Sequence, residues 1–340
     1  PNGSKEGDLV FVAGHPGRTR RLSTHATLEM FRDTMFPWLV NYLKDKEAFL
    51  LDYSKQGPEA FRQSKEELFT IQNSRKARIG GLGGLNDRDF MARKKAAEDR
   101  LKSEIARDSS IAKETATAWD KMAGAQAASA ANYADYQFLE RGFALDSELF
   151  RIARILVRMS QELQKPNDQR LPEYRDSSLP SLKLELFSEA PLYPDFEKAK
   201  LAFGFAEWKR QKPNDPLLAK VLGSKTPRQR ADELVEKTRL ADVAVRRKLA
   251  DEGAKGIEAS EDPFIKLALT VDERAREIRK KQEDQVEAVE TPQYGLIAKA
   301  LFALQGDSVY PDATFTLRLA FGQVKGYTVD GKTIPPYTRI

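Results

Sequence analysis

The stretch GDLVFVAGHPGRTRRL, residues 7–22, contains one compact apolar run, Leu9 to Ala13, between two glycine-containing turns. A short apolar run bounded by turn residues predicts a buried strand. Strand patterns return near the other end of the chain, in ATFTLRLAF, residues 313–321, where Phe315, Leu317, Leu319 and Phe321 fall on alternate positions. Asp330-Gly331 then predicts a β-hairpin. These strands are too few to form a sheet domain of their own.

Between the two strand regions, residues 24–305 follow a helical pattern. Apolar residues recur at steps of three and four, as in Leu28, Phe31, Met35, Trp38 and Tyr42. Pro37 should kink or split this first helix. The remaining expected helices run from Pro58 to just before Gly80, from a cap at Asn86-Asp87 onward, and over residues 136–164, 227–250, 263–288 and 292–304. Residues 164–196 read as an ordered loop with short turns.

This pattern predicts a mainly α fold, with a large helical insertion between strands of a β-domain. We divide the chain into residues 1–23, which supply a strand and turn, residues 24–305, which form the helical domain, and residues 306–340, which return to strands. The strands should pair with each other or keep unpaired edges, and exposed edges favour aggregation or a homodimer. A closed barrel within the chain would contradict this prediction.

Composition limits the classes of function. Hydrophobic residues make up 41% and charged residues 31% of the 340 residues, and no apolar run reaches the length of a membrane span. The absence of cysteine excludes disulfides, thiolate metal sites and cysteine nucleophiles. The opening Pro1-Asn2-Gly3-Ser4 has no signal-peptide character, so we expect an internal piece of a longer protein or a processed chain.

The sequence predicts no catalytic triad and no metal site. His15 and His25 are the two histidines, one within a Gly-His-Pro-Gly turn and one at the start of a helix. No serine lies in a glycine-flanked nucleophile elbow, and the histidines lack the spacing of zinc ligands. Acidic residues alternate with lysine and arginine at helical spacing, as solvated helix faces do. We therefore expect no catalytic residue, no metal and no cofactor in this chain.

The sequence favours neither a phosphate-binding loop nor a nucleic-acid-binding surface. The glycines of RIGGLGGLND, residues 78–87, do not follow a strand and lack a Gly-Lys-Ser/Thr ending, so they read as the end of a helix and not as a phosphate loop. Basic residues cluster around Arg18, Arg75 and Arg93, but acidic residues interrupt them and no recognition motif accompanies them. The net charge of +5 is modest, and we expect no nucleic-acid partner.

Four segments resemble, in order, those of serine peptidase family 46, the bacterial dipeptidyl-peptidases of the 7 and 11 type. The first is GDLVFVAGHPGRTRRL, in which His15 stands where the family usually has Tyr. The second is NSRKARIG, in which Asn73, Lys76 and Gly80 keep the spacing Asn-x-x-Lys-x-x-x-Gly. The others are KPNDQRLPEYRDSSLPSL and YPDATFTLRLAFGQVKGY. Together they extend over nearly the whole chain.

The resemblance implies a chymotrypsin-like double β-barrel with a large helical domain inserted into it. That domain caps the active cleft, so that peptides enter by their free N-terminus and leave as dipeptides. The family's asparagine at the position of Asn73 helps to bind the substrate's N-terminal ammonium, which suits an amide oxygen as acceptor. The resemblance also implies a periplasmic or secreted location.

The family's catalytic residues have no counterpart among these 340 residues. Its histidine and aspartate precede the segment that resembles residues 7–22, and its serine follows the segment that resembles residues 310–327. We therefore expect this chain alone to be inactive, although the parent protein is a serine dipeptidyl-peptidase. The alternative is a stand-alone, non-catalytic helical binding or scaffold protein.

Overall fold

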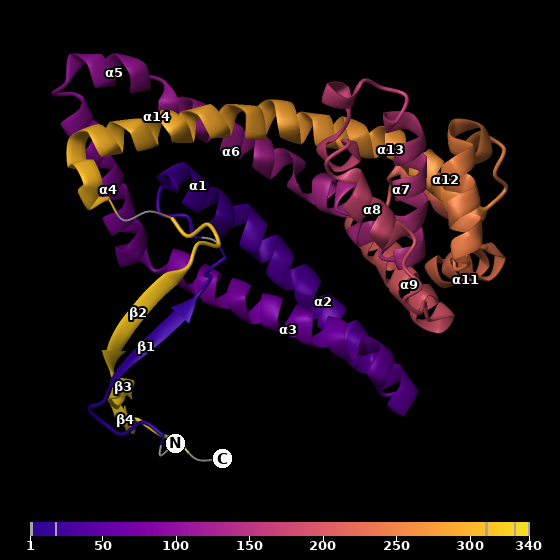
Figure 1. Cartoon of the computed structure of the whole chain (residues 1–340), viewed down its shortest axis with the longest axis horizontal. Helices are drawn as coiled ribbons and strands as arrows, with labels where there is room; N and C mark the ends of the chain where they lie inside the picture. Colours follow the sequence, from indigo (N-terminus) through magenta and orange to yellow (C-terminus); the bar gives the residue numbers. More distant parts are fainter. Residues whose placement is uncertain (1–2, 18, 310–311, 330, 339–340) are drawn as a thin grey trace.

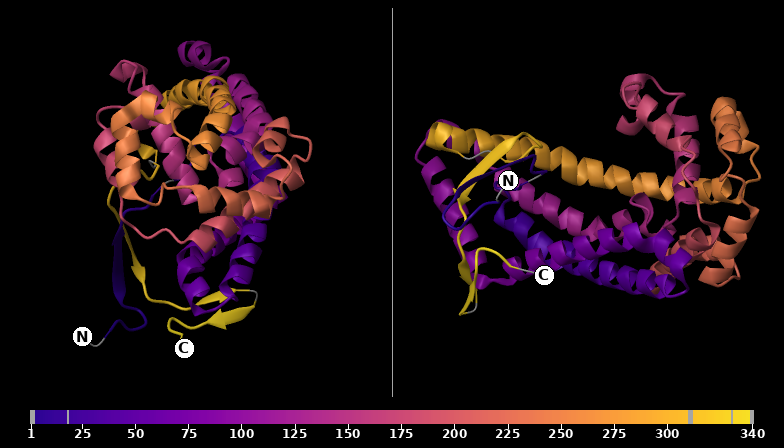
Figure 2. Two further views of the ribbon diagram at one scale, coloured as in Figure 1. Left: turned by 90° about the vertical axis from the view of Figure 1, so that its right-hand side faces the viewer. Right: turned by 60° about the horizontal axis from the view of Figure 1, so that its bottom comes forward.

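Long helices make up most of the molecule, and two small antiparallel sheets lie at one end of it (Figure 1). The computed structural model describes residues 3–17, 19–309, 312–329 and 331–338, so Arg18 and Asp330, both named above, lie outside the described residues. Both ends of the chain lie on the side of the sheets (Figures 1 and 2). The predicted mainly α fold class is confirmed.

The first part of the helical region consists of long helices and the short elements that join them. They are α1 (His25–Met30), the π-helical turn η1 (Phe31–Met35), α2 (Phe36–Ser54), α3 (Pro58–Asn86), α4 (Arg88–Ile105), the short α5 (Ser109–Thr115), α6 (Ala118–Asp135) and the π-helical turn η2 (Tyr136–Glu140). The alanine-rich α6 packs closely against α1 and α14. Pro37 lies in the first turn of α2, directly after η1, so the expected interruption is present.

The second part is a bundle of shorter helices that holds the main hydrophobic core, including Phe150, Phe205, Trp208 and Phe264. It comprises η3 (Phe143–Leu145), α7 (Glu148–Glu162), η4 (Asn167–Gln169), η5 (Pro172–Tyr174), α8 (Leu179–Leu186), α9 (Pro194–Gln211), α10 (Pro216–Leu222), α11 (Pro227–Lys237) and α12 (Val243–Glu258). The chain then returns along α6 through α13 (Pro263–Gln282), the π-helical turn η6 (Glu283–Glu287) and α14 (Ala288–Gln305), followed by η7 (Gly306–Ser308) (Figure 1).

Several predicted helix boundaries are wrong. The expected helix over residues 136–164 breaks at Gly142, whose φ of +79° suits glycine, and α7 restarts with Ser147 as its N-cap. The expected helix over 227–250 breaks after Lys237, and Asp242 caps the next one. Residues 164–196, expected as a loop, contain the eight-residue helix α8.

Two other predicted helix ends are absent. The helix α3 continues through Gly80–Gly84 to Asn86, because Leu85 is buried on its inner side. Likewise, α13, η6 and α14 follow one another without a break, and Pro292 lies inside α14. Ile297 packs there against Ala118 and Met122 of α6, and this contact holds the helix together beyond the proline. The predicted cap at Asp87 is confirmed, since its carboxylate accepts hydrogen bonds from the Asp89 and Phe90 amides.

The strands from the two ends of the chain pair with each other, as predicted. Strand β1 (Leu9–Gly14) runs antiparallel to β2 (Arg318–Gln323), and Leu9 lies opposite Gln323 and Gly14 opposite Arg318. A second sheet joins β3 (Tyr327–Val329) to β4 (Lys332–Ile334), which confirms the predicted hairpin strands. No closed barrel is formed by the described strands.

Two details of the strand prediction are wrong. Strand β2 begins at Arg318, because Phe315 adopts a φ of +61° and its amide bonds to the Pro16 carbonyl. The β1 strand was expected to be buried, yet Leu9, Phe11 and Val12 are exposed, since β2 covers one edge of β1 and neither of its faces.

Candidate functional site

The helices α2 and α3 form an antiparallel hairpin that carries Asn73. They join at Gly57, whose φ of +148° allows the turn into Pro58 at the start of α3. Leu50 and Tyr53 of α2 and Leu68 of α3 pack with Phe196 of α9. The hairpin is therefore anchored to the second helical bundle through an apolar cluster.

A buried lysine adds a polar anchor to the same hairpin. Lys46 of α2 is almost fully buried; its ammonium lies 2.8 Å from Glu67 of α3 and also pairs with Asp146, which follows η3. Its ammonium lies 5.4 Å from the centre of the Phe203 ring of α9. Ion pairs and a cation–π contact thus compensate the cost of burying this charge.

Glu47 fixes the rotation of α3 around Asn73. Its carboxylate accepts a hydrogen bond of 3.1 Å from the Gln72 amide and another from the Arg75 guanidinium. Burial works to raise the pKa of Glu47, but the hydrogen bonds from Arg75 and Gln72 outweigh it and lower the pKa below its ordinary value. Gln72 and Arg75 are therefore held toward α2.

Asn73 lies between these two residues in sequence and is exposed. Within the described part of the chain, its side-chain amide has no hydrogen-bond partner. An amide offers one carbonyl oxygen that accepts and one NH₂ group that donates, so Asn73 can bind an ammonium or a carbonyl of a ligand. The predicted role of Asn73 stays a prediction.

The segments around Thr19 and Asp312 meet at the base of the β1–β2 ribbon. The Thr19 hydroxyl donates to the Asp312 carboxylate at 2.6 Å, and the Arg21 amide donates to the same oxygen at 2.9 Å. The His15 imidazole lies 2.9 Å from the Phe315 carbonyl oxygen, at its Nδ1 atom. Segments about 300 residues apart in sequence therefore form one connected turn region.

The ribbon itself presents apolar side chains to solvent. Phe11 and Phe321 lie opposite each other with ring centres 6.3 Å apart, and they are 61% and 76% exposed. Leu319 of β2 and Tyr327 of the following strand β3 are also mostly exposed. So many large exposed hydrophobic residues on neighbouring strands mark a surface that another protein segment can cover.

A family model described as Peptidase S46 matches residues 1–340. The chain belongs to this family. The resemblance found in the sequence to S46 peptidases is thereby confirmed. A curated relative is an Asp/Glu-specific dipeptidyl-peptidase of Shewanella putrefaciens, which is 25% identical over 348 residues, covering 100% of this chain and 47% of the relative. The S46 chain described here thus spans about half the length of that relative.

Solved structures have the same fold as this S46 chain. A crystal structure of Porphyromonas endodontalis DPP11 in complex with the dipeptide Arg-Glu matches with a TM-score of 0.68 and 19% identity, over 98% of this chain and 48% of that chain. A complex of the same protein with the dipeptide Arg-Asp gives a TM-score of 0.68 and 19% identity, over 98% and 47% of the two chains.

Neither histidine of the S46 chain contacts a serine hydroxyl in the described structure. His15 bonds to the Phe315 backbone, whereas His25 lies 3.4 Å from Glu29, and its backbone amide donates to Glu98. Among the described residues there is no group of three or more potential metal-ligating side chains. Within these residues, no helix is long and apolar enough to cross a membrane.

The basic clusters of the S46 chain have partners inside the molecule. Arg75 pairs with Glu47, the Arg78 guanidinium lies 5.7 Å from the Phe36 ring centre, and Lys95 pairs with Asp99 at 2.8 Å.

Sequence reasoning missed Glu47, the residue that holds Gln72 and Arg75. It lies among other charged residues on an amphipathic helix, and its partners on α3 are 25 and 28 positions away. A solvated glutamate and an interhelical one look alike in such a pattern, so no local signal could have identified it.

Proposed function

We propose that this chain is the helical, cleft-covering part of a serine dipeptidyl-peptidase that removes dipeptides from the free N-terminus of peptides. In this proposal the Asn73 side-chain oxygen accepts a hydrogen bond from the substrate's N-terminal ammonium. The observation that carries the proposal is the exposed Asn73 amide on a helix whose rotation Glu47 fixes, in a chain of the S46 family.

The ends of the chain support a helical domain inserted into a β-structure. The ribbon β1–β2 joins residues from both ends, and its exposed apolar side chains suit contact with further strands of a barrel. We place the nucleophile, its histidine base and the aspartate in parts of the protein that contribute those strands, so that the 340 residues alone are inactive.

The proposed cellular setting follows the family resemblance. We assign the protein to the periplasm or to the outside of the cell, where peptides with free N-termini are available. The reaction needs no cofactor, because hydrolysis by an activated serine uses only side chains and water.

The decisive experiment replaces Asn73 with Ala in the full-length protein and measures hydrolysis of peptides with free N-termini. Loss of a hydrogen bond to a charged group removes about 1.5–3 kcal/mol, so we expect kcat/KM to fall by roughly 10- to 100-fold. Asn73→Asp, which keeps an acceptor oxygen, should retain most of the activity. Thr70→Ala, an exposed position one turn earlier on α3, is the matched control.

Two results would contradict the proposal. If Asn73→Ala cleaved as well as the unaltered protein, Asn73 would not bind the ammonium. If the full-length protein cleaved none of a range of free and N-acetylated peptides, and took no label from a fluorophosphonate, a non-catalytic binding protein would replace the peptidase.

A further inference from the structure

A cavity of about 450 Å³ lies where the two parts of the helical region meet, and no residue of α3 lines it. Residues of two π-helical turns line it, Tyr136 and Glu140 from η2 and Glu283 and Glu287 from η6. Such turns interrupt regular helices and occur often at functional sites. The other walls come from α7, η5, α8 and α13.

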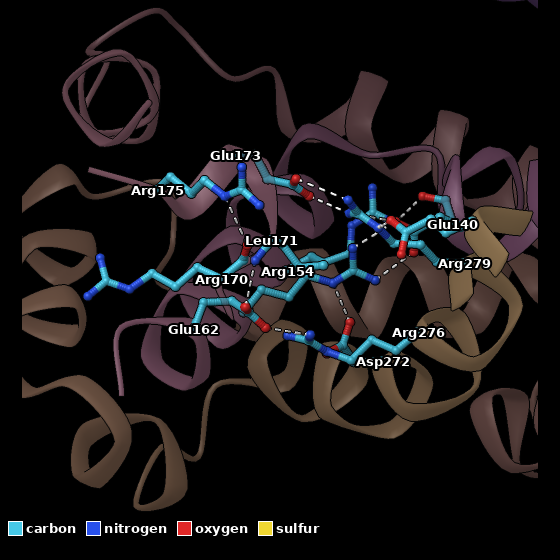
Figure 3. A network of polar contacts seen from close by, with 12 residues as sticks. Glu140, Arg154, Glu162, Arg170, Leu171, Glu173, Arg175, Asp272, Arg276 and Arg279 are labelled. Carbon is cyan, nitrogen blue, oxygen red and sulfur yellow. Dashed lines mark hydrogen bonds and ion pairs between the residues drawn. The ribbon is translucent and has the colours of Figure 1, made fainter. Parts of the chain in front are cut away.

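Most charged groups around this cavity already have partners of opposite charge (Figure 3). Arg158 pairs with Glu140 and with Asp272, each at 2.6 Å. Arg279 pairs with Glu173 and lies 2.7 Å from Glu283. Glu185 pairs with Arg151. These carboxylates and guanidinium groups satisfy one another, and they leave few acceptors for any other donor.

Arg154 lacks a carboxylate partner among the described residues. Its Nη1 atom donates to the carbonyl oxygens of Leu139 at 3.1 Å and Glu140 at 2.8 Å, at the end of η2. This capping role occupies one of its three nitrogens, and Arg154 lies in the wall of the cavity. Burial and the charge of Arg158 lower the pKa of Arg154.

Tyr174 supplies a second donor without an acceptor. Its side chain lines the cavity, the residue is only 3% exposed, and no described residue accepts a hydrogen bond from its hydroxyl. Burial raises the pKa of Tyr174 well above its usual value, so the hydroxyl keeps its proton. Among the described residues, the side-chain atoms that are both closed off from solvent and without a hydrogen-bond partner belong to Arg230, Asp232 and Gln293, and not to Tyr174. The Tyr174 hydroxyl is therefore open to the cavity.

We propose that this cavity binds a small anion with a carboxylate or phosphate group, which accepts hydrogen bonds from the Tyr174 hydroxyl and from the free edge of the Arg154 guanidinium. Both donors reach the cavity, and hydrogen bonds to an ionised acceptor are charge-assisted and stronger than those between neutral groups. Two exposed residues of the same wall, Arg141 and Glu287, make no ion pair with a described residue, so Arg141 adds a positive charge and Glu287 a negative one. The site is independent of the proposed peptidase function.

Isothermal titration calorimetry on the full-length protein tests the site, with sodium phosphate and sodium succinate as separate probes at constant ionic strength. We expect saturable binding of at least one probe, and the stronger one identifies the anion as a phosphate or a carboxylate. Tyr174→Phe, which removes only the hydroxyl, should weaken binding by about tenfold or more. Arg141→Gln, at an exposed position that tolerates substitution, should weaken it several-fold.

Tyr133→Phe is the matched control for Tyr174→Phe. Tyr133 is also buried, burial also raises its pKa, and it does not line the cavity. This variant should bind the anion as the unaltered protein does. Absence of binding for both probes would overturn the proposal. So would equal affinity in Tyr174→Phe, Arg141→Gln and the unaltered protein, because the anion would then bind elsewhere.

Discussion

Glu47 shows how one partly buried carboxylate can orient a side chain to which it does not bond. It holds Gln72 and Arg75, which precede and follow Asn73 on α3, so that the helix cannot rotate without breaking both hydrogen bonds. Lys46, the preceding residue, pairs with Glu67 on the same helix. The exposed direction of Asn73 is thus set by two neighbouring residues of α2.

The lowered pKa of Glu47 predicts an effect of pH on stability. A carboxylate with a lowered pKa contributes stability above its ordinary pKa, near 4.5, and this contribution is lost as the pH falls through the lower folded value. We expect Glu47→Gln to lower the free energy of unfolding by about 1–2 kcal/mol at pH 7. The difference from the unaltered protein should shrink as the pH falls below about 4.

Urea denaturation at several pH values measures this effect. Glu66→Gln is the control, because Glu66 is exposed on α3 and its carboxylate makes no ion pair with a described residue. A difference between Glu47→Gln and the unaltered protein that stayed constant between pH 7 and pH 3 would contradict the prediction.

The helix α3 is unusual in containing four glycines over residues 80–84 without ending there. A Cβ atom at Gly83 would meet no heavy atom within 4 Å, whereas one at Gly81 would lie 2.8 Å from the Phe36 ring. Gly81 therefore allows α3 to approach the start of α2 closely, next to the π-helical turn η1. No contact within the described structure explains Gly83.

The two glycines predict different effects of substitution by alanine. Gly83→Ala should raise the free energy of unfolding by about 0.5–1 kcal/mol, because alanine favours the helix and the added methyl group has room. Gly81→Ala should raise the free energy of unfolding by less than this, or lower it, since the Phe36 ring must move. Thermal unfolding of both variants measures the difference. Equal stabilisation by the two substitutions would show that the α2–α3 contact is looser than described.

Features that depend on adjacent residues could be predicted from the sequence, whereas features that depend on contacts between distant segments could not. The Asp87 cap and the interruption near Pro37 were predictable, because each depends on a few adjacent residues. The pairing of β1 with β2 was one of two expected outcomes, because the two strands have few other strands in this chain to pair with. The continuation of α14 through Pro292 was not, because contacts with α6 outweigh the local cost of proline. For the candidate sites, Asn73 came from a motif, whereas Glu47 and the Arg154–Tyr174 cavity depend on distant segments.

The whole molecule combines a well-packed helical region with a ribbon whose faces are uncovered. The main core includes residues such as Trp208 and Phe264 that have no solvent exposure, whereas Phe11 and Phe321 are mostly exposed. A folded helical region and an exposed apolar ribbon should therefore behave differently in solution. The first resists denaturation, and the second promotes contact between molecules.

The 340-residue chain alone should self-associate through this ribbon. We expect its sedimentation coefficient to rise with protein concentration, and the substitution of both Phe11 and Phe321 by Ser should reduce this rise. Leu184→Ser is the control, because Leu184 is highly exposed on α8, outside the ribbon. Sedimentation as a monomer at all concentrations, or an equal effect of the control, would contradict the prediction.

The pairing of β1 with β2 also constrains the order of events during synthesis. Val12 lies opposite Ala320, so the first strand leaves the ribosome some 300 residues before its partner. At 5–20 residues per second, that interval is roughly 15–60 s. Closing an unfolded loop of this length costs on the order of 5 kcal/mol. Prior folding of the intervening helices brings the two strands together and reduces this cost, so the β1 strand stays without its partner strand until then.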